Sequence, residues 1–157
     1  MNFSYFFDLA LALILGFLIG LEREWARKEA GLRTFSLVSL GSALFCLISR
    51  IGVEKYLRET SLDPFRVLSQ IVVGVGFLGA GIIIFREKEG ILTGLTTAAD
   101  IWVTAGIGAA VGLGYYSLAI FTTILVLLLL FIVPPFEKKI EKRIENIKEN
   151  IKKETPL

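Results

Sequence analysis

Histidine is absent from the 157 residues of the chain, and cysteine and methionine occur once each. Without histidine there is no Ser-His-Asp or Cys-His catalysis, no histidine metal site and no imidazole that changes charge near neutral pH. The single cysteine, Cys46, allows neither an internal disulfide nor a CxxC metal site. The sequence also has no basic, aromatic-rich surface, so neither an enzyme nor a nucleic-acid partner is expected.

Charged residues are missing from long stretches, and hydrophobic residues fill them. They make up 54% of the chain and the mean hydropathy is +0.69. A helix needs about 20 mostly apolar residues to cross a bilayer. Five segments meet this condition, near Ser4–Leu21, Thr34–Ile51, Val67–Phe85, Leu95–Leu113 and Ser117–Val133. The prediction is an all-α polytopic membrane protein with a five-helix transmembrane domain over residues 1–135.

The last segment, residues 136–157, is predicted to be a short cytoplasmic amphipathic helix. Pro134 and Pro135 are expected to end the fifth span before it. Five large apolar residues then recur at helical spacing: Phe136, Ile140, Ile144, Ile147 and Ile151. This seam is too short for an independent coiled coil. Three roles stay open: packing against a second copy or a partner, lying on membrane lipid, or remaining solvated.

Lysine and arginine are distributed unequally between the connections. Thirteen of them lie in the first connection, the third connection and the tail, whereas four flank or occupy the second connection: Arg50, Lys55, Arg58 and Arg66. Cytoplasmic loops carry the excess of positive charge in membrane proteins. We therefore expect a multi-pass protein of the cell inner membrane, with its N-terminus outside and its C-terminus in the cytoplasm.

Glycines suited to close helix packing lie in three of the spans. Helices in lipid associate through close backbone approach rather than water exclusion. The candidates are Gly16 and Gly20 in the first span, Gly74, Gly76, Gly79 and Gly81 in the third, and Gly108 and Gly112 in the fourth. We expect these three helices to form a tight inner cluster, with the leucine-rich fifth span facing lipid. Residues 74–79 also match G-x-G-x-x-G, but no strand precedes them, so a dinucleotide site is rejected.

Asp100 is the polar residue that most needs an explanation, because it lies inside the fourth span. A carboxylate there has to be paired, hydrated or protonated. Hydroxyl residues recur around it at helical spacing and form a polar stripe: Thr93, Thr96, Thr97 and Thr104. The ends of the first two spans add candidates at the same depth: Glu22, Arg23, Arg33 and Thr34. Asp8 and Gln70, toward the outer side, are weaker signals, and Asp8 is close enough to the N-terminus to be interfacial.

Three interpretations of Asp100 stay open. It belongs to a polar pocket that opens to the cytoplasm and binds a cation, a proton or a polar group of a partner; or it forms a structural ion pair with Arg23 or Arg33; or it snorkels to the lipid edge. Magnesium and calcium accept carboxylate and hydroxyl oxygens, but the sequence fixes no coordination geometry. Weak magnesium binding is the only ligand expectation, and no cofactor is predicted.

Four ordered blocks of the chain resemble the MgtC/SapB family over roughly residues 9–133. They are Gly16–Glu24, Ala30–Thr34, Val75–Gly81 and Gly94–Trp102, followed by Ala105–Gly108. The resemblance implies a small bacterial inner-membrane protein linked to growth in low magnesium and, in pathogens, to survival inside host cells. It also implies that members regulate other membrane machinery, including the proton-driven ATP synthase, so that the name magnesium transporter is doubtful.

By position, the resemblance implies a set of sensitive residues: Glu22, Arg23, Gly31, Arg33, Thr34, Gly79, Gly81, Thr96, Thr97, Ala98 and Trp102. Two departures put a shared partner contact in doubt. Thr93 stands where some members have arginine, and Asp100 stands where a small polar residue is common. Longer members carry a cytoplasmic domain similar to ligand-binding ACT modules, and this chain is expected to be too short to hold it.

Three functions remain as hypotheses. The first is a non-enzymatic regulator that acts through its helices on another membrane system linked to magnesium or ion homeostasis. The second is a cation or proton transport subunit with Asp100 and Glu22 on the path. The third is a structural module that forms a homodimer through its glycine faces and tail.

The distribution of positive charge gives the first testable prediction. A membrane-impermeant label added to intact cells should modify the N-terminal end of the chain and leave the C-terminal end unmodified, because 13 of the 17 basic residues fall on the C-terminal side. Permeabilised cells serve as the control, since both ends should then react. Labelling of both ends in intact cells would contradict the odd number of spans.

Overall fold

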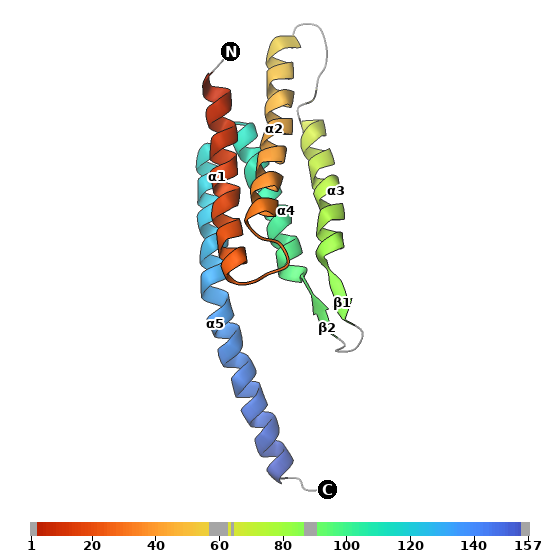
Figure 1. The fold of residues 1–157 in the computed structure, drawn as a ribbon, viewed down its shortest axis with the longest axis vertical. Helices are drawn as coiled ribbons and strands as arrows, with labels where there is room; N and C mark the ends of the chain where they lie inside the picture. Colours follow the sequence, from red (N-terminus) through yellow and green to blue (C-terminus); the bar gives the residue numbers. More distant parts are fainter. Residues whose placement is uncertain (1–2, 57–62, 64, 87–90, 155–157) are drawn as a thin grey trace.

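The computed structural model describes residues 3–56, 63, 65–86 and 91–154 of the chain. Five helices in this part are long and apolar enough to cross a membrane: α1 (Phe3–Trp25), α2 (Leu32–Tyr56), α3 (Phe65–Ile82), α4 (Leu95–Gly112) and α5 (Tyr116–Glu154). They run side by side along one axis, with the start of α1 and the end of α5 at opposite ends of the molecule (Figure 1). The predicted five-helix membrane protein is confirmed. Arg58 and Lys88, counted among the loop charges, lie outside the described residues.

The third helix ends before Phe85, so the predicted span to that residue is wrong. α3 stops at Ile82, and β1 (Ile84–Arg86) pairs antiparallel with β2 (Ile91–Thr93), with Phe85 opposite Leu92. Branched and aromatic side chains favour a strand, which explains why an apolar sequence leaves the helix here. Gly94, at φ +86, then turns the chain into α4, and a side chain at this position would collide with the carbonyl oxygen of Ile82.

The prediction that the prolines end the fifth helix is also wrong. α5 continues through Pro134 and Pro135 to Glu154, so the expected amphipathic tail is the continuation of the last span. Proline's fixed φ is compatible with a helix, and its cost comes from the lost N–H and from contact with the carbonyl one turn earlier. Pro135 is exposed. Side chains Phe136, Ile140, Ile144 and Ile147 are exposed along this extension, and that of Ile151 lies outside the described residues.

The tight centre of the bundle is made by α1, α2 and α4, and not by α1, α3 and α4 as expected. A Cβ on Gly16 would lie 2.6 Å from the carbonyl oxygen of Phe35 in α2, and one on Gly20 would lie 2.8 Å from the Cα of Leu32. Side chains at Gly108 and Gly112 of α4 would likewise collide with backbone oxygens of α2. All four glycines pack against α2, and α2 has no glycine facing them. The glycine pattern of the sequence therefore does not identify α2 as their partner.

The glycines of α3 mostly face open space, which corrects their assignment as packing residues within the chain. A Cβ on Gly74, Gly76 or Gly81 would meet nothing within 4 Å. Gly79 alone among them faces another helix, with Ala98 of α4 3.6 Å from such a Cβ. Residues 74–79 form one continuous helix, as the rejection of a dinucleotide site requires. α3 therefore rests on α4 along one edge and leaves its other faces free.

The close approach of α4 to α2 predicts different effects for two neighbouring glycines. Gly108→Ala should lower the free energy of unfolding by about 1–3 kcal/mol, because the new methyl group collides with the Ser39 backbone. Gly106→Ala on the same helix is the matched control and should leave stability unchanged or raise it, since its Cβ meets nothing within 4 Å. Thermal unfolding of the two variants in detergent measures the difference, and equal melting temperatures would contradict the packing.

Candidate functional site

A buried charge cluster lies where the end of α1 meets the start of α4. The Arg23 side chain sits between two carboxylates: its Nε contacts the carboxylate of Glu22, and its Nη1 lies 3.3 Å from Oδ2 of Asp100. The three residues are 8% (Glu22), 2% (Arg23) and 7% (Asp100) exposed. A charged group inside a membrane protein is stable when it is paired and faces protein. We call Glu22, Arg23 and Asp100 the inner cluster.

Local backbone geometry holds the inner cluster in place. Arg23 is in the last turn of α1, where the loop folds back so that the N–H of Lys28 donates to the Arg23 carbonyl at 3.0 Å. Asp100 is in the second turn of α4, and the Thr104 hydroxyl donates to its carbonyl oxygen at 2.7 Å. The α1–α2 loop also reaches α4 directly, because the Thr97 hydroxyl donates to Glu29 at 2.8 Å. Both helix ends are therefore tied together beside the ion pairs.

A cavity of about 630 Å³ opens next to the inner cluster. Its polar wall comes from the end of α1 and the start of α4. The opposite wall comes from α5 and is apolar apart from Glu137. The principal lining residues are Glu22, Arg23, Lys28, Thr96, Leu130 and Pro134. A space with charged groups on one side and apolar side chains on the other suits a polar or charged group carried by a hydrophobic partner.

The structure brings together only part of the residue set expected from the sequence. Arg23, and not Arg33, pairs with Asp100, and Arg33 is exposed at the start of α2. Trp102 is 51% exposed, because two residues along a helix turn a side chain to the opposite face. Thr34 is half-buried, and no contact within the described residues joins it to the Asp100 carboxylate. Arg33, Thr34 and Trp102 are therefore separate from the inner cluster.

A second buried charge cluster, which the sequence analysis missed, lies at the opposite end of the bundle. Asp8 of α1 is fully buried, and its carboxylate accepts hydrogen bonds from Nη2 of Arg50 in α2 at 2.7 Å and from the Tyr116 hydroxyl of α5 at 2.6 Å. Asp8, expected to be a weak signal near the N-terminus, is therefore buried and paired with a cation and a hydroxyl donor. A usable signal was present, since Asp8 and Arg50 fall at the same depth of neighbouring antiparallel spans. We call Asp8, Arg50 and Tyr116 the outer cluster.

The inner cluster does not fit a magnesium site well. Within the part of the chain that the structure describes, no group of three or more Asp, Glu, Cys or His side chains is placed to hold a metal ion. The carboxylates of Glu22 and Asp100 both contact the Arg23 guanidinium, whose charge repels a cation. Magnesium also demands near-octahedral oxygen coordination, which two carboxylates committed to an arginine do not provide.

Known proteins resemble this chain over most of its length. The model of the MgtC family matches residues 9–139. "Putative magnesium transporter YhiD" of Escherichia coli K12 is 46% identical over 132 residues, which are 83% of this chain and 60% of that protein. "Protein MgtC" of Salmonella typhimurium LT2 is 46% identical over 127 residues, which are 80% of this chain and 50% of that protein. The chain thus spans 50–60% of the length of these relatives. No solved structure matches.

The inner cluster predicts that Arg23 stabilises the fold far more than Arg33. Arg23→Met should lower the free energy of unfolding by about 3–5 kcal/mol, because it leaves two buried carboxylates without a cation. Arg33→Met, the matched control on an exposed arginine, should change it by less than about 0.5 kcal/mol. Denaturant titration in mixed micelles measures both variants. An equal decrease in the free energy of unfolding of both variants would show that the ion pairs of Arg23 contribute no specific stability.

Proposed function

The chain belongs to the MgtC family, and from that membership we propose that it is a non-enzymatic regulator that contacts another protein complex of the inner membrane. The contact surface is the cavity beside the inner cluster. We further propose that its N-terminus lies outside and its C-terminus in the cytoplasm, so that the cavity lies at the cytoplasmic end. The proposal rests on one observation: a charged cavity opens at one end of the bundle, whereas buried apolar side chains fill the middle of the bundle.

Regulation by contact is supported by the chemistry of the cavity wall. Glu22, Arg23 and Lys28 offer fixed charges of both signs, and Thr96 offers an exposed hydroxyl on the same wall. The opposite wall is the lipid-facing helix α5, which a partner helix can reach laterally within the membrane. A partner that inserts a polar side chain here gains charge-assisted hydrogen bonds in a region of low dielectric.

A conduit through the bundle is disfavoured by what lies between the two charge clusters. Asp8 and Glu22 are 14 residues apart in α1, which is about 21 Å along a helix. Ile19, Phe35 and Ile107 are among the fully or almost fully buried side chains in this interval. The hydroxyls of Ser39 and Thr104 here donate to helix carbonyls rather than lining a path. An ion crossing the bundle would have to displace this apolar layer.

A cation or proton transport subunit is the second candidate. Two carboxylates, Glu22 and Asp100, face one guanidinium, so the inner cluster has an excess of acidic groups beside an open cavity. The printed name of the Escherichia coli relative, "Putative magnesium transporter YhiD", points in the same direction. In this candidate the two carboxylates would release Arg23 to take up the transported ion.

Assembly with a second copy is the third candidate. The extension of α5 beyond the prolines exposes Phe136, Ile140, Ile144 and Ile147 along its length. An exposed apolar seam on a helix is stabilised when it packs against a second seam of the same kind. A homodimer through this seam is compatible with regulation, because none of these four side chains lines the cavity beside the inner cluster.

Crosslinking from the cavity tests the proposed regulator. A photoreactive amino acid at position 96, which lines the cavity, should crosslink the chain to a foreign membrane protein in native membranes. The same group at position 125, on the exposed face of α5, is the matched control and should give mainly lipid adducts. Crosslinks only between copies of the chain would instead support the assembly module.

Ion flux separates the regulator from the transport subunit. Liposomes that contain only this protein should show no magnesium or proton flux above that of empty liposomes. Flux that is present in the wild-type chain and lost in Asp100→Asn would contradict the regulator and favour transport. Circular dichroism of the variant provides the control that its helices remain formed.

A further inference from the structure

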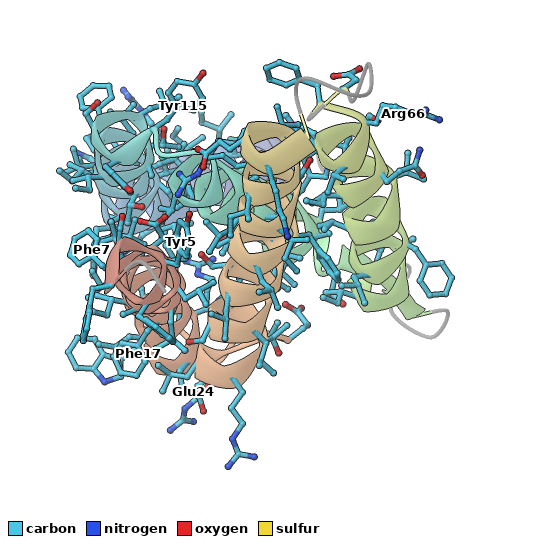
Figure 2. All side chains as sticks on the ribbon, turned by 90° about the horizontal axis from the view of Figure 1, so that it is seen from above. Tyr5, Phe7, Phe17, Glu24, Arg66 and Tyr115 are labelled. Atoms are coloured by element: carbon cyan, nitrogen blue, oxygen red, sulfur yellow. The ribbon has the colours of Figure 1, made fainter. Side chains whose placement is uncertain are left out.

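A lipid-facing groove of about 690 Å³ separates α2 from α3. α3 packs chiefly against α4 and has little contact with α2, although the two helices stand next to each other (Figure 1). Seen down the bundle, α3 lies at its edge (Figure 2). The groove lies on a different face from the cavity beside the inner cluster and shares no lining residue with it.

The walls of the groove are apolar over most of its length. Their principal residues are Leu37, Gly41 and Phe45 of α2, and Ile71, Gly74 and Leu78 of α3. The two glycines keep the groove wide, because a Cβ on Gly41 or Gly74 would meet nothing within 4 Å. From Arg66 to Leu78 the groove follows 12 residues of α3, which is about 18 Å along a helix. From Gln70 to Leu78 the groove covers about 12 Å along the helix, which is most of the roughly 15 Å thickness of one leaflet of the hydrocarbon core.

Two polar side chains, Arg66 and Gln70, line the end of the groove where α3 begins. They are four residues apart, so they lie on one face of the helix, about 6 Å apart along its axis. Both are exposed, and neither has a hydrogen-bond or ion-pair partner through its side chain among the described residues. The nearby carboxylate of Asp63 accepts the backbone N–H of Phe65 at 2.9 Å.

We propose that this groove holds an anionic phospholipid of the surrounding bilayer. The Arg66 guanidinium binds the headgroup phosphate, which is the geometry and charge that arginine recognises best. The Gln70 amide lies about one helical turn deeper, at the level of the glycerol esters, and donates to an ester carbonyl. One acyl chain then occupies the space between Gly41 and Gly74.

The polar end of the groove favours a phospholipid over a helix from another protein. A helix is about 10–12 Å across and is itself apolar where it faces another helix in lipid. Such a helix would leave Arg66 and Gln70 without acceptors unless it carried an acidic and a polar residue at the matching depths. A phospholipid carries a phosphate and ester carbonyls at these two depths in every molecule.

Native mass spectrometry tests the proposal. The full chain is reconstituted in vesicles of phosphatidylethanolamine and phosphatidylglycerol, then released from mild detergent and weighed with its bound lipid. The wild-type chain should retain one phosphatidylglycerol in preference to phosphatidylethanolamine. Gly74→Leu should abolish retention because leucine fills the groove, and Gly41→Leu should do the same from the opposite wall.

Two matched controls isolate the groove and the arginine. Gly76→Leu lies on the same helix and also meets nothing within 4 Å, but it does not line the groove, so retention should be unchanged. Arg66→Gln should lower phosphatidylglycerol retention roughly fivefold, whereas Arg33→Gln, at an exposed arginine elsewhere, should not.

Several results would overturn the proposal. The first is a wild-type chain that retains no phospholipid; the second is equal retention by Gly74→Leu and Gly76→Leu; the third is a preference for phosphatidylglycerol that survives Arg66→Gln. Conversion of a lipid-free dimer into a monomer by Gly74→Leu would instead make the groove an interface between copies. The melting temperature of each leucine variant shows whether the helices still pack.

Discussion

Ser39 of α2 is a residue that two other helices, α1 and α4, both approach closely. A Cβ on Gly16 of α1 would lie 2.7 Å from the Ser39 Cβ, and a side chain at Gly108 of α4 would collide with the Ser39 carbonyl oxygen. The Ser39 hydroxyl also donates to the carbonyl of Ala12 at 2.7 Å. Because dispersion contacts and hydrogen bonds replace the hydrophobic effect inside lipid, this close approach fixes how α1 and α4 lie relative to each other. The contact between Arg23 and Asp100 depends on it.

The two charge clusters then complete the bundle at its ends. The outer cluster joins α1, α2 and α5 through Asp8, and its carboxylate has both a cation and a hydroxyl donor. The inner cluster joins α1 and α4 through Arg23, with more acidic groups than basic ones and a cavity beside it. The outer cluster is balanced in charge, and the pocket beside it, lined by Arg50, measures only about 160 Å³, so it is suited to holding helices together. An unbalanced cluster that opens to a cavity is suited to receiving a further group, and this difference is why the inner end is the candidate site.

The sequence predicts the spans well because their length and hydropathy are set by the bilayer, and it predicts the pairing of helices poorly. The glycine counts pointed to α3, yet packing depends on which face a glycine occupies, and Gly74, Gly76 and Gly81 face open space. On α2, Ser39 and Ala43 lie opposite glycines of the neighbouring helices, and these two residues form no recognisable packing motif in the sequence. For the site, Glu22, Arg23 and Asp100 could be placed at one depth from their positions in the spans. The choice of Arg23 over Arg33 required the rotation of each helix, which sequence periodicity does not fix.

α4 is the element through which the two sides of the molecule are connected. It carries Asp100 on the face toward α1, and two residues earlier Ala98 contacts α3 at Gly79. The strands β1 and β2 join the end of α3 to the start of the same helix. α3 therefore contacts the first two turns of α4, where Thr96, Thr97 and Asp100 lie. A groove occupant that displaced α3 would reach this segment through Gly79 and Ala98. It would then change the energy of binding in the cavity beside the inner cluster, and a cavity occupant would change the energy of binding in the groove by the same amount.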